Sequence, residues 1–177
     1  MWRELKAFSP PKENLTLKSR AWVELGVLKV AFNLTGDLGS VLAPMPVDLP
    51  ARVIGLWEST CFEMFIKNSE KEEYFEFNCS SANNWNIFYF PKKRAALKEF
   101  TPISNLASST VLKDDQLSVS FWIDLKKLPI GFWIDGQMKL GLTSVLESKS
   151  GGLSYWALEH LDTKPNFHKP ESFSFLL

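Results

Sequence analysis

Two stretches of the chain combine an indole ring with carboxyl and amide groups. The first stretch, WESTCFEMFI, begins with Trp57 and contains Glu63, and the second, YFEFNCS, contains Glu76 and Asn78. An indole offers a flat apolar face to the C–H groups of a sugar ring. Carboxylates and amides exchange hydrogen bonds with hydroxyl groups. These residue types predict a surface for a small saccharide if the fold places them on one face.

The alternation of a β-hairpin decides which of these side chains share a face. Pairing Phe62 with Phe77 and Met64 with Phe75 gives the hairpin one apolar and one polar face. The apolar face then consists of Phe62, Met64, Phe75, Phe77 and Cys79. The other face carries Trp57, if the strand extends back that far, and Cys61, Glu63, Tyr74, Glu76 and Asn78. A shift by one residue would mix the two sets, so this register is the prediction. It also predicts that Cys61 and Cys79 are not bridged, which suits a reducing compartment.

Strand-like alternation dominates the rest of the chain. The expected strands are 22–34 (one long or two short), 60–66, 74–80, 86–90, 116–125, 138–147 and 153–159. We expect loops at 43–53 and 100–109, one short turn at 125–129, and no strong amphipathic helix. Short strands separated by turns predict an all-β protein, an antiparallel sandwich or barrel.

Length and charge limit the classes of protein. The 177 residues predict one domain, 1–177, large enough to fold without disulfides or metals. A formal net charge of zero argues against a nucleic-acid partner. No apolar run is long enough to span a membrane, and the N-terminus has no secretory h-region. We therefore expect a cytoplasmic protein, and the sequence leaves its oligomeric state open.

Two longer stretches resemble a known family. They are LWESTCFEMFI followed by YFEFNCSSANNWNIFYF, and the C-terminal LSYWALEHLDTKPNFHKPESFSFLL. Over residues 56–177 they resemble DOMON-like domains related to family 9 carbohydrate-binding modules. The resemblance implies a β-sandwich of jelly-roll type that binds a ligand without chemistry.

The resemblance also implies where a saccharide would bind. Trp57 and Trp156 match two tryptophans that clamp the sugar, and Glu63 matches an acidic position. Trp156 is therefore expected to be partly exposed, across a cleft from Trp57. Tyr89 stands where many relatives carry an arginine. The predicted ligand-binding residues are Trp57, Glu63, Glu76, Asn78, Tyr89 and Trp156.

Other functions remain open. DOMON-type relatives can hold haem, for which His160, His168, Met64 or Met138 could be the axial ligand. Some family modules bind calcium, but no loop here is dense enough in carboxylates to assign it, and we expect no cofactor. His160, Asp162 and His168 fit no defined zinc spacing, and His168 is expected to bond backbone groups.

Two further alternatives concern the predicted binding face itself. Glu63 and Glu76, opposite each other in the predicted register, could form a glycosidase pair. A module that kept the fold for protein interaction but lost its ligand is also consistent with the sequence.

Overall fold

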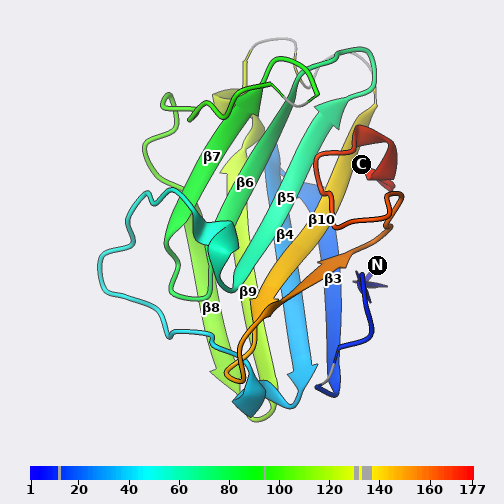
Figure 1. Cartoon of the computed structure of the whole chain (residues 1–177). Coiled ribbons are helices and arrows are strands. Elements are labelled where there is room, and N and C mark those ends of the chain that lie inside the picture. Colours follow the sequence, from blue (N-terminus) through cyan, green and yellow to red (C-terminus); the bar gives the residue numbers. More distant parts are fainter. Residues whose placement is uncertain (12, 94, 130–131, 133–136) are drawn as a thin grey trace.

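Two antiparallel sheets pack face to face in the computed structural model (Figure 1). The structure describes residues 1–11, 13–93, 95–129, 132 and 137–177. The prediction of an all-β sandwich is confirmed, and the jelly-roll type stays a prediction. Helical structure in the described residues is confined to short 3-10 turns, η1 (Leu38–Ser40), η2 (Leu56–Glu58), η3 (Leu125–Lys127) and η4 (Pro170–Ser172). No helix in this part of the chain is long and apolar enough to cross a membrane.

The first sheet has the strand order β1-β3-β4-β9-β8. Its strands are β1 (Arg3–Glu4), β3 (Leu15–Glu24), β4 (Val27–Gly36), β8 (Ala107–Lys113) and β9 (Gln116–Asp124). The stretch 22–34 is divided between β3 and β4, because Leu25 and Gly26 both have positive φ and form a two-residue hairpin turn. The loop predicted at 100–109 is wrong from Ala107 onward. Strand β8 is an edge strand whose side chains are exposed or only half-buried, so it has no apolar alternation to detect.

The second sheet carries the polar hairpin. Its strand order is β2-β11-β10-β5-β6-β7, and β12 pairs with the first residues of β10. The strands are β2 (Lys6–Ala7), β5 (Cys61–Asn68), β6 (Tyr74–Ser80), β7 (Trp85–Phe90), β10 (Met138–Glu147), β11 (Leu153–Ala157) and β12 (Phe175–Leu176). The inner faces of the two sheets enclose the main core, where Phe32 of β4 meets Phe62 of β5 with 5.4 Å between ring centroids.

The register of the β5–β6 hairpin differs from the prediction by two residues. Phe62 pairs with Cys79 and Met64 with Phe77. A shift of two keeps every side chain on its predicted face, so the separation of apolar and polar faces is correct. The prediction of unbridged cysteines is confirmed, since Cys61 and Cys79 are free and buried.

The observed register changes how the two glutamates meet. Glu63 lies opposite Asn78, and Glu76 lies opposite Phe65. The prediction placed the two carboxyl groups directly opposite each other. In the structure they are diagonal neighbours instead. Diagonal neighbours on a sheet are farther apart than directly paired residues.

Candidate functional site

A second, smaller apolar cluster covers one end of the outer face of the second sheet. Its buried members are Phe65, Tyr74, Phe88, Phe90 and Phe173. The C-terminal segment lies over this cluster, because Phe173 stacks on Phe65 with 5.5 Å between centroids. Gly141 of β10 leaves room for that ring, since a Cβ there would lie 2.6 Å from Phe173 Cδ1.

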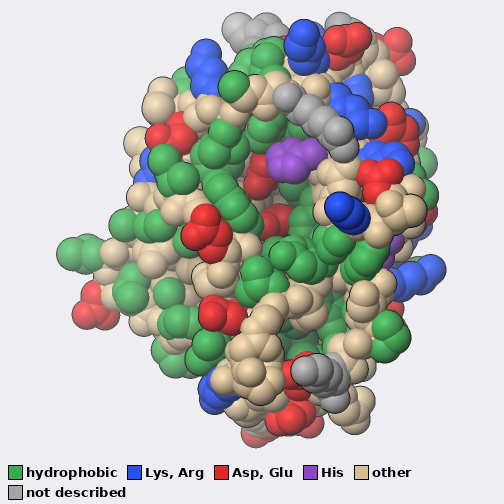
Figure 2. Space-filling model, viewed as in Figure 1, with side chains coloured by type: hydrophobic (Ala, Val, Ile, Leu, Met, Phe, Trp, Pro, Cys, Tyr) green, Lys and Arg blue, Asp and Glu red, His purple; other side chains and the backbone are tan. Residues whose placement is uncertain are grey.

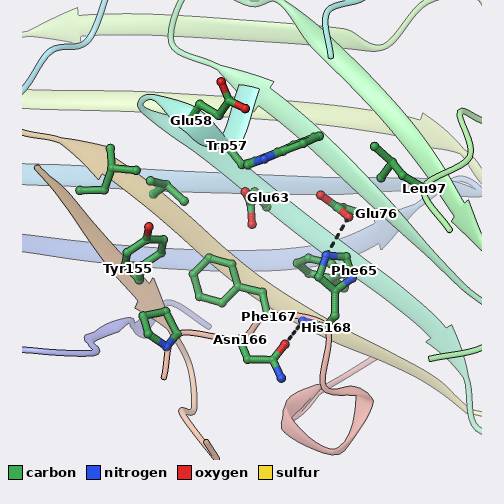
Figure 3. Close-up of a pocket in the computed structure, with 13 residues that line it drawn as sticks. Trp57, Glu58, Glu63, Phe65, Glu76, Leu97, Tyr155, Asn166, Phe167 and His168 are labelled. Carbon is green, nitrogen blue, oxygen red and sulfur yellow. Dashed lines mark hydrogen bonds and ion pairs between the residues drawn. The ribbon is translucent and has the colours of Figure 1, made fainter. Parts of the chain in front are cut away.

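Beside this cluster the outer face is hollowed into a groove of about 430 Å³, a size typical of small-molecule sites. Figure 2 shows the hollow, with carboxyl groups and a histidine inside it. The lining residues are Trp57, Glu58, Glu63, Phe65, Glu76, Leu97, Val145, Leu153, Tyr155, Pro165, Asn166, Phe167 and His168. In Figure 3 the carboxyl groups of Glu63 and Glu76 lie between Trp57 on one side and Phe167 on the other.

Glu63 lies at the floor of the groove and is only 2% exposed. Thr143, its partner on β10, donates a 2.8 Å hydrogen bond from Oγ1 to Glu63 Oε2. Burial, and to a lesser degree the nearby Glu76 carboxylate, raises the pKa of Glu63 to about 8. At neutral pH this carboxyl group is therefore mostly protonated and can both donate and accept a hydrogen bond.

Glu76 has one satisfied and one unsatisfied oxygen. Asn78 Nδ2 donates a 2.8 Å bond to Oε1, whereas Oε2 is buried and has no hydrogen-bond partner among the residues that the structure describes. Burial raises the pKa of Glu76 to about 7. A buried acceptor without a partner costs free energy, so Oε2 is a ready acceptor for a ligand donor.

His168 projects over Glu76 from the C-terminal segment. Its Nε2 lies 3.6 Å from Glu76 Oε2, and its Nδ1 lies 3.0 Å from the Tyr74 hydroxyl. Desolvation lowers the pKa of His168, so the ring is neutral near pH 7. The prediction that the His168 ring bonds backbone groups is wrong, because both of these ring contacts are to side chains.

Trp57 belongs to η2 rather than to an extension of β5. Gly55 precedes this turn with φ of 83°, a conformation that favours glycine, and Glu58 N bonds back to Gly55 O. The indole packs edge-on against Phe88, with 5.6 Å between centroids, and remains partly exposed in the groove. Trp57 therefore lines the same groove as Glu63, as predicted, but a 3-10 turn rather than a strand places it there.

Trp156 does not lie in the groove. It is 3% exposed and belongs to the core between the sheets, so the predicted exposure and the clamp with Trp57 are wrong. Trp156 points into the core because it pairs with Ser144, whose side chain lies on the inner face of β10. Tyr155, one residue earlier, faces outward and lines the groove instead.

Two other residues predicted to bind the ligand also lie outside the groove. Tyr89 pairs with Phe75, packs on that ring and donates to Glu73, so it lies on the face opposite the groove. Asn78 is fully buried and does not line the groove. Its contact with Glu76 makes it a positioning residue.

Sequence reasoning missed several residues that line the groove or, like Thr143, hold a lining residue in place. Tyr155 and Thr143 could have been found from strand alternation if the inner face of β10 had been known. Phe167 and His168 lie in a segment with no periodicity. An Asx-type bond from His168 N to Asn166 Oδ1, drawn in Figure 3, helps to hold that segment.

The described residues contain no group of three His, Cys, Asp or Glu side chains placed to hold a metal ion. His160 Nε2 donates to Lys6 O, whereas His168 Nδ1 contacts the Tyr74 hydroxyl, so the two histidines have different partners. Met64, one of the possible haem ligands, is a core residue with 1% exposure.

Two solved structures share this fold. A candidate carbohydrate-binding protein from Bacteroides uniformis ATCC 8492 matches with a TM-score of 0.70 and 14% identity, over 98% of this chain and 84% of the other. A family 9 carbohydrate-binding module from Caldicellulosiruptor kristjanssonii, in complex with glucose, matches with a TM-score of 0.56 and 12% identity, over 88% and 73% of the two chains. No protein-family model matches the sequence, and no curated protein does. The predicted relation to family 9 modules is thus supported at the level of the fold, and its DOMON-like part stays a prediction.

Proposed function

We propose that this chain is a non-catalytic carbohydrate-binding module that holds a small saccharide or the end of a glycan in the groove. The observation that carries the proposal is the make-up of the groove, with aromatic walls and two buried carboxyl groups at the floor. The shared fold with a module in complex with glucose supports it.

The walls and the floor of the groove would contact different parts of a sugar. The partly exposed rings of Trp57, Tyr155 and Phe167 offer faces or edges to the C–H groups of a sugar. Glu76 Oε2 lacks a hydrogen bond, and a sugar hydroxyl could supply it. The clamp in this proposal is therefore Trp57 with Phe167 and Tyr155, in place of the predicted pair with Trp156.

Binding is favoured over glycoside hydrolysis by the state of the carboxyl groups. Burial raises the pKa of both Glu63 and Glu76. A glycosidase pair instead keeps one carboxylate ionised while it raises the pKa of the other.

Titration calorimetry of the wild-type protein against a panel of mono- and disaccharides tests the proposal. An open groove desolvates only part of a ring, so we expect a Kd of roughly micromolar to millimolar. Chromatography of the same mixtures should show the sugars unchanged. Absence of heat with every sugar would contradict binding, and release of shorter sugars would contradict the non-catalytic part.

A further inference from the structure

We propose that the groove selects a cationic saccharide, an amino sugar whose ammonium group lies against Glu76 and Glu63. This inference rests on the proposed function and names its ligand class. It is carried by the charge of the groove, by the unsatisfied oxygen of Glu76, and by the diagonal placement of the two carboxyl groups on one face of the sheet.

The described residues that line the groove include no lysine or arginine. They carry three carboxyl groups, those of Glu58, Glu63 and Glu76, and one histidine. The titratable groups around the floor are Glu58 from η2, Cys61 and Glu63 from β5, Tyr74 and Glu76 from β6, Tyr155 from β11 and His168 from the C-terminal segment. None of these except His168 can supply a positive charge, and His168 is held neutral near pH 7 by desolvation, which lowers its pKa.

A buried carboxylate normally has a cation or several donors beside it. Glu76 is 3% exposed, and Asn78 is the only side chain that donates to it among the hydrogen bonds of the described residues. Among the described residues its Oε2 has no hydrogen-bond donor, and the ion pairs within 4 Å give it one basic neighbour, the Nε2 atom of His168 at 3.6 Å. Within the described part of the chain, the site therefore offers an acceptor without a countercharge.

A neutral hydroxyl and an ammonium group would satisfy this site to different degrees. Either one can donate to Glu76 Oε2. Only the ammonium group also offsets the repulsion between the two carboxylates, which contributes to the raised pKa of Glu63. Glu63 and Glu76 are buried at the floor of the groove, where that attraction is stronger than in bulk solvent, and the indole face of Trp57 also attracts cations.

The test compares three sugars that differ only at C2: 2-amino-2-deoxyglucose, its N-acetyl derivative and glucose. Titrated at pH 6.5, where the amine is charged, the amino sugar should bind at least about tenfold more tightly than the other two, as expected for a hydrogen bond to a charged group. Its binding should also release protons, because the ammonium group favours the ionised carboxyl groups. Titrations in buffers of different ionisation enthalpy measure that release.

Glu76→Gln should lower the affinity for the amino sugar by a larger factor than the affinity for glucose, so that most of the preference is lost, and it should reduce the proton release. Glu159→Gln removes an exposed carboxylate outside the groove and should leave both readouts as in the wild type. If Glu76→Gln does not fold, the proton release of the wild-type protein still decides the question.

Two results would overturn the inference, and they differ. If neutral sugars bind as tightly as the amino sugar, or binding releases no protons, the groove binds saccharides without selecting a cation, and the proposed function stands. If none of the three sugars nor any other sugar binds, the proposed function fails and the inference fails with it.

Discussion

Tyr155 and Trp156 are neighbours on β11 with opposite surroundings, because Tyr155 lines the groove and Trp156 is packed in the core. Alternation placed them on opposite faces of one strand, which is correct. Both side chains suit a core or a binding surface, so the sequence alone did not say which face is inner. The pairing of Trp156 with Ser144 decides this, and pairing across strands depends on the whole sheet.

Trp156→Ala should therefore destabilise the protein rather than alter a binding surface. Removing a buried indole leaves a cavity, and the free energy of unfolding should fall by about 3–5 kcal/mol. Chemical denaturation measures this. A loss below about 1 kcal/mol would mean that Trp156 is not packed in the core.

Trp57→Ala should act mainly on binding. The partly exposed indole packs edge-on against Phe88, so we expect a stability loss of about 1–2 kcal/mol and at least tenfold weaker saccharide binding. Trp122→Ala is the matched control, since Trp122 is 37% exposed on β9 in the other sheet. Equal effects of the two variants on calorimetric affinity would rule out Trp57 as a binding residue.

Glu63→Gln should make the protein more stable at alkaline pH. A carboxyl group whose pKa is raised by folding binds its proton more tightly in the folded state. The unfolding free energy therefore falls as pH rises from about 4.5, the ordinary value, to about 8, the value in the folded protein. Glutamine keeps the acceptor for Thr143 and carries no charge. The variant should gain roughly 2–4 kcal/mol over the wild type at pH 8 compared with pH 5. The same gain at both pH values, measured by urea unfolding, would contradict a buried ionising group.

At the scale of elements, the strands with one apolar face were predictable because their alternation is strong. The segments around β5, β6, β7, β9, β10 and β11 follow this pattern. Strand β8 and the C-terminal segment were not predictable. The first is an exposed edge strand and the second has no periodicity, so contacts with residues distant in the sequence determine where they lie. Phe167 and His168 reach the groove only through such contacts.

Gly141→Ala should disturb the element that builds one wall of the groove. The new methyl group would lie 2.6 Å from Phe173 Cδ1, well inside carbon–carbon contact distance. Displacing Phe173 should cost about 1–3 kcal/mol of stability and weaken saccharide binding, because Phe167 and His168 lie on the same segment.

Gly39→Ala is the control for this change, since its added carbon would meet only Asp37 Oδ1 at 3.6 Å. Thermal unfolding and calorimetry of both variants give the comparison. Unchanged stability and affinity in Gly141→Ala would show that the C-terminal segment does not depend on the Phe173 contact.

At the scale of the whole molecule, the two inner faces of the sheets form the core, and the candidate site lies on an outer face. The second sheet uses its outer face for an aromatic cluster and, beside it, a groove with two buried carboxyl groups. Buried ionisable groups destabilise the empty protein, and such costs are typical of binding sites, where function and stability are in conflict.

The indole N–H signals of the seven tryptophans give the most direct test of the groove as the saccharide site. In a 1H–15N correlation spectrum, assigned with Trp57→Phe and Trp122→Phe variants, a titrated saccharide should shift the Trp57 signal. The Trp122 signal, from the other sheet, should stay in place. A shift at Trp122 without one at Trp57, or no shift at any tryptophan at millimolar sugar, would contradict saccharide binding in this groove.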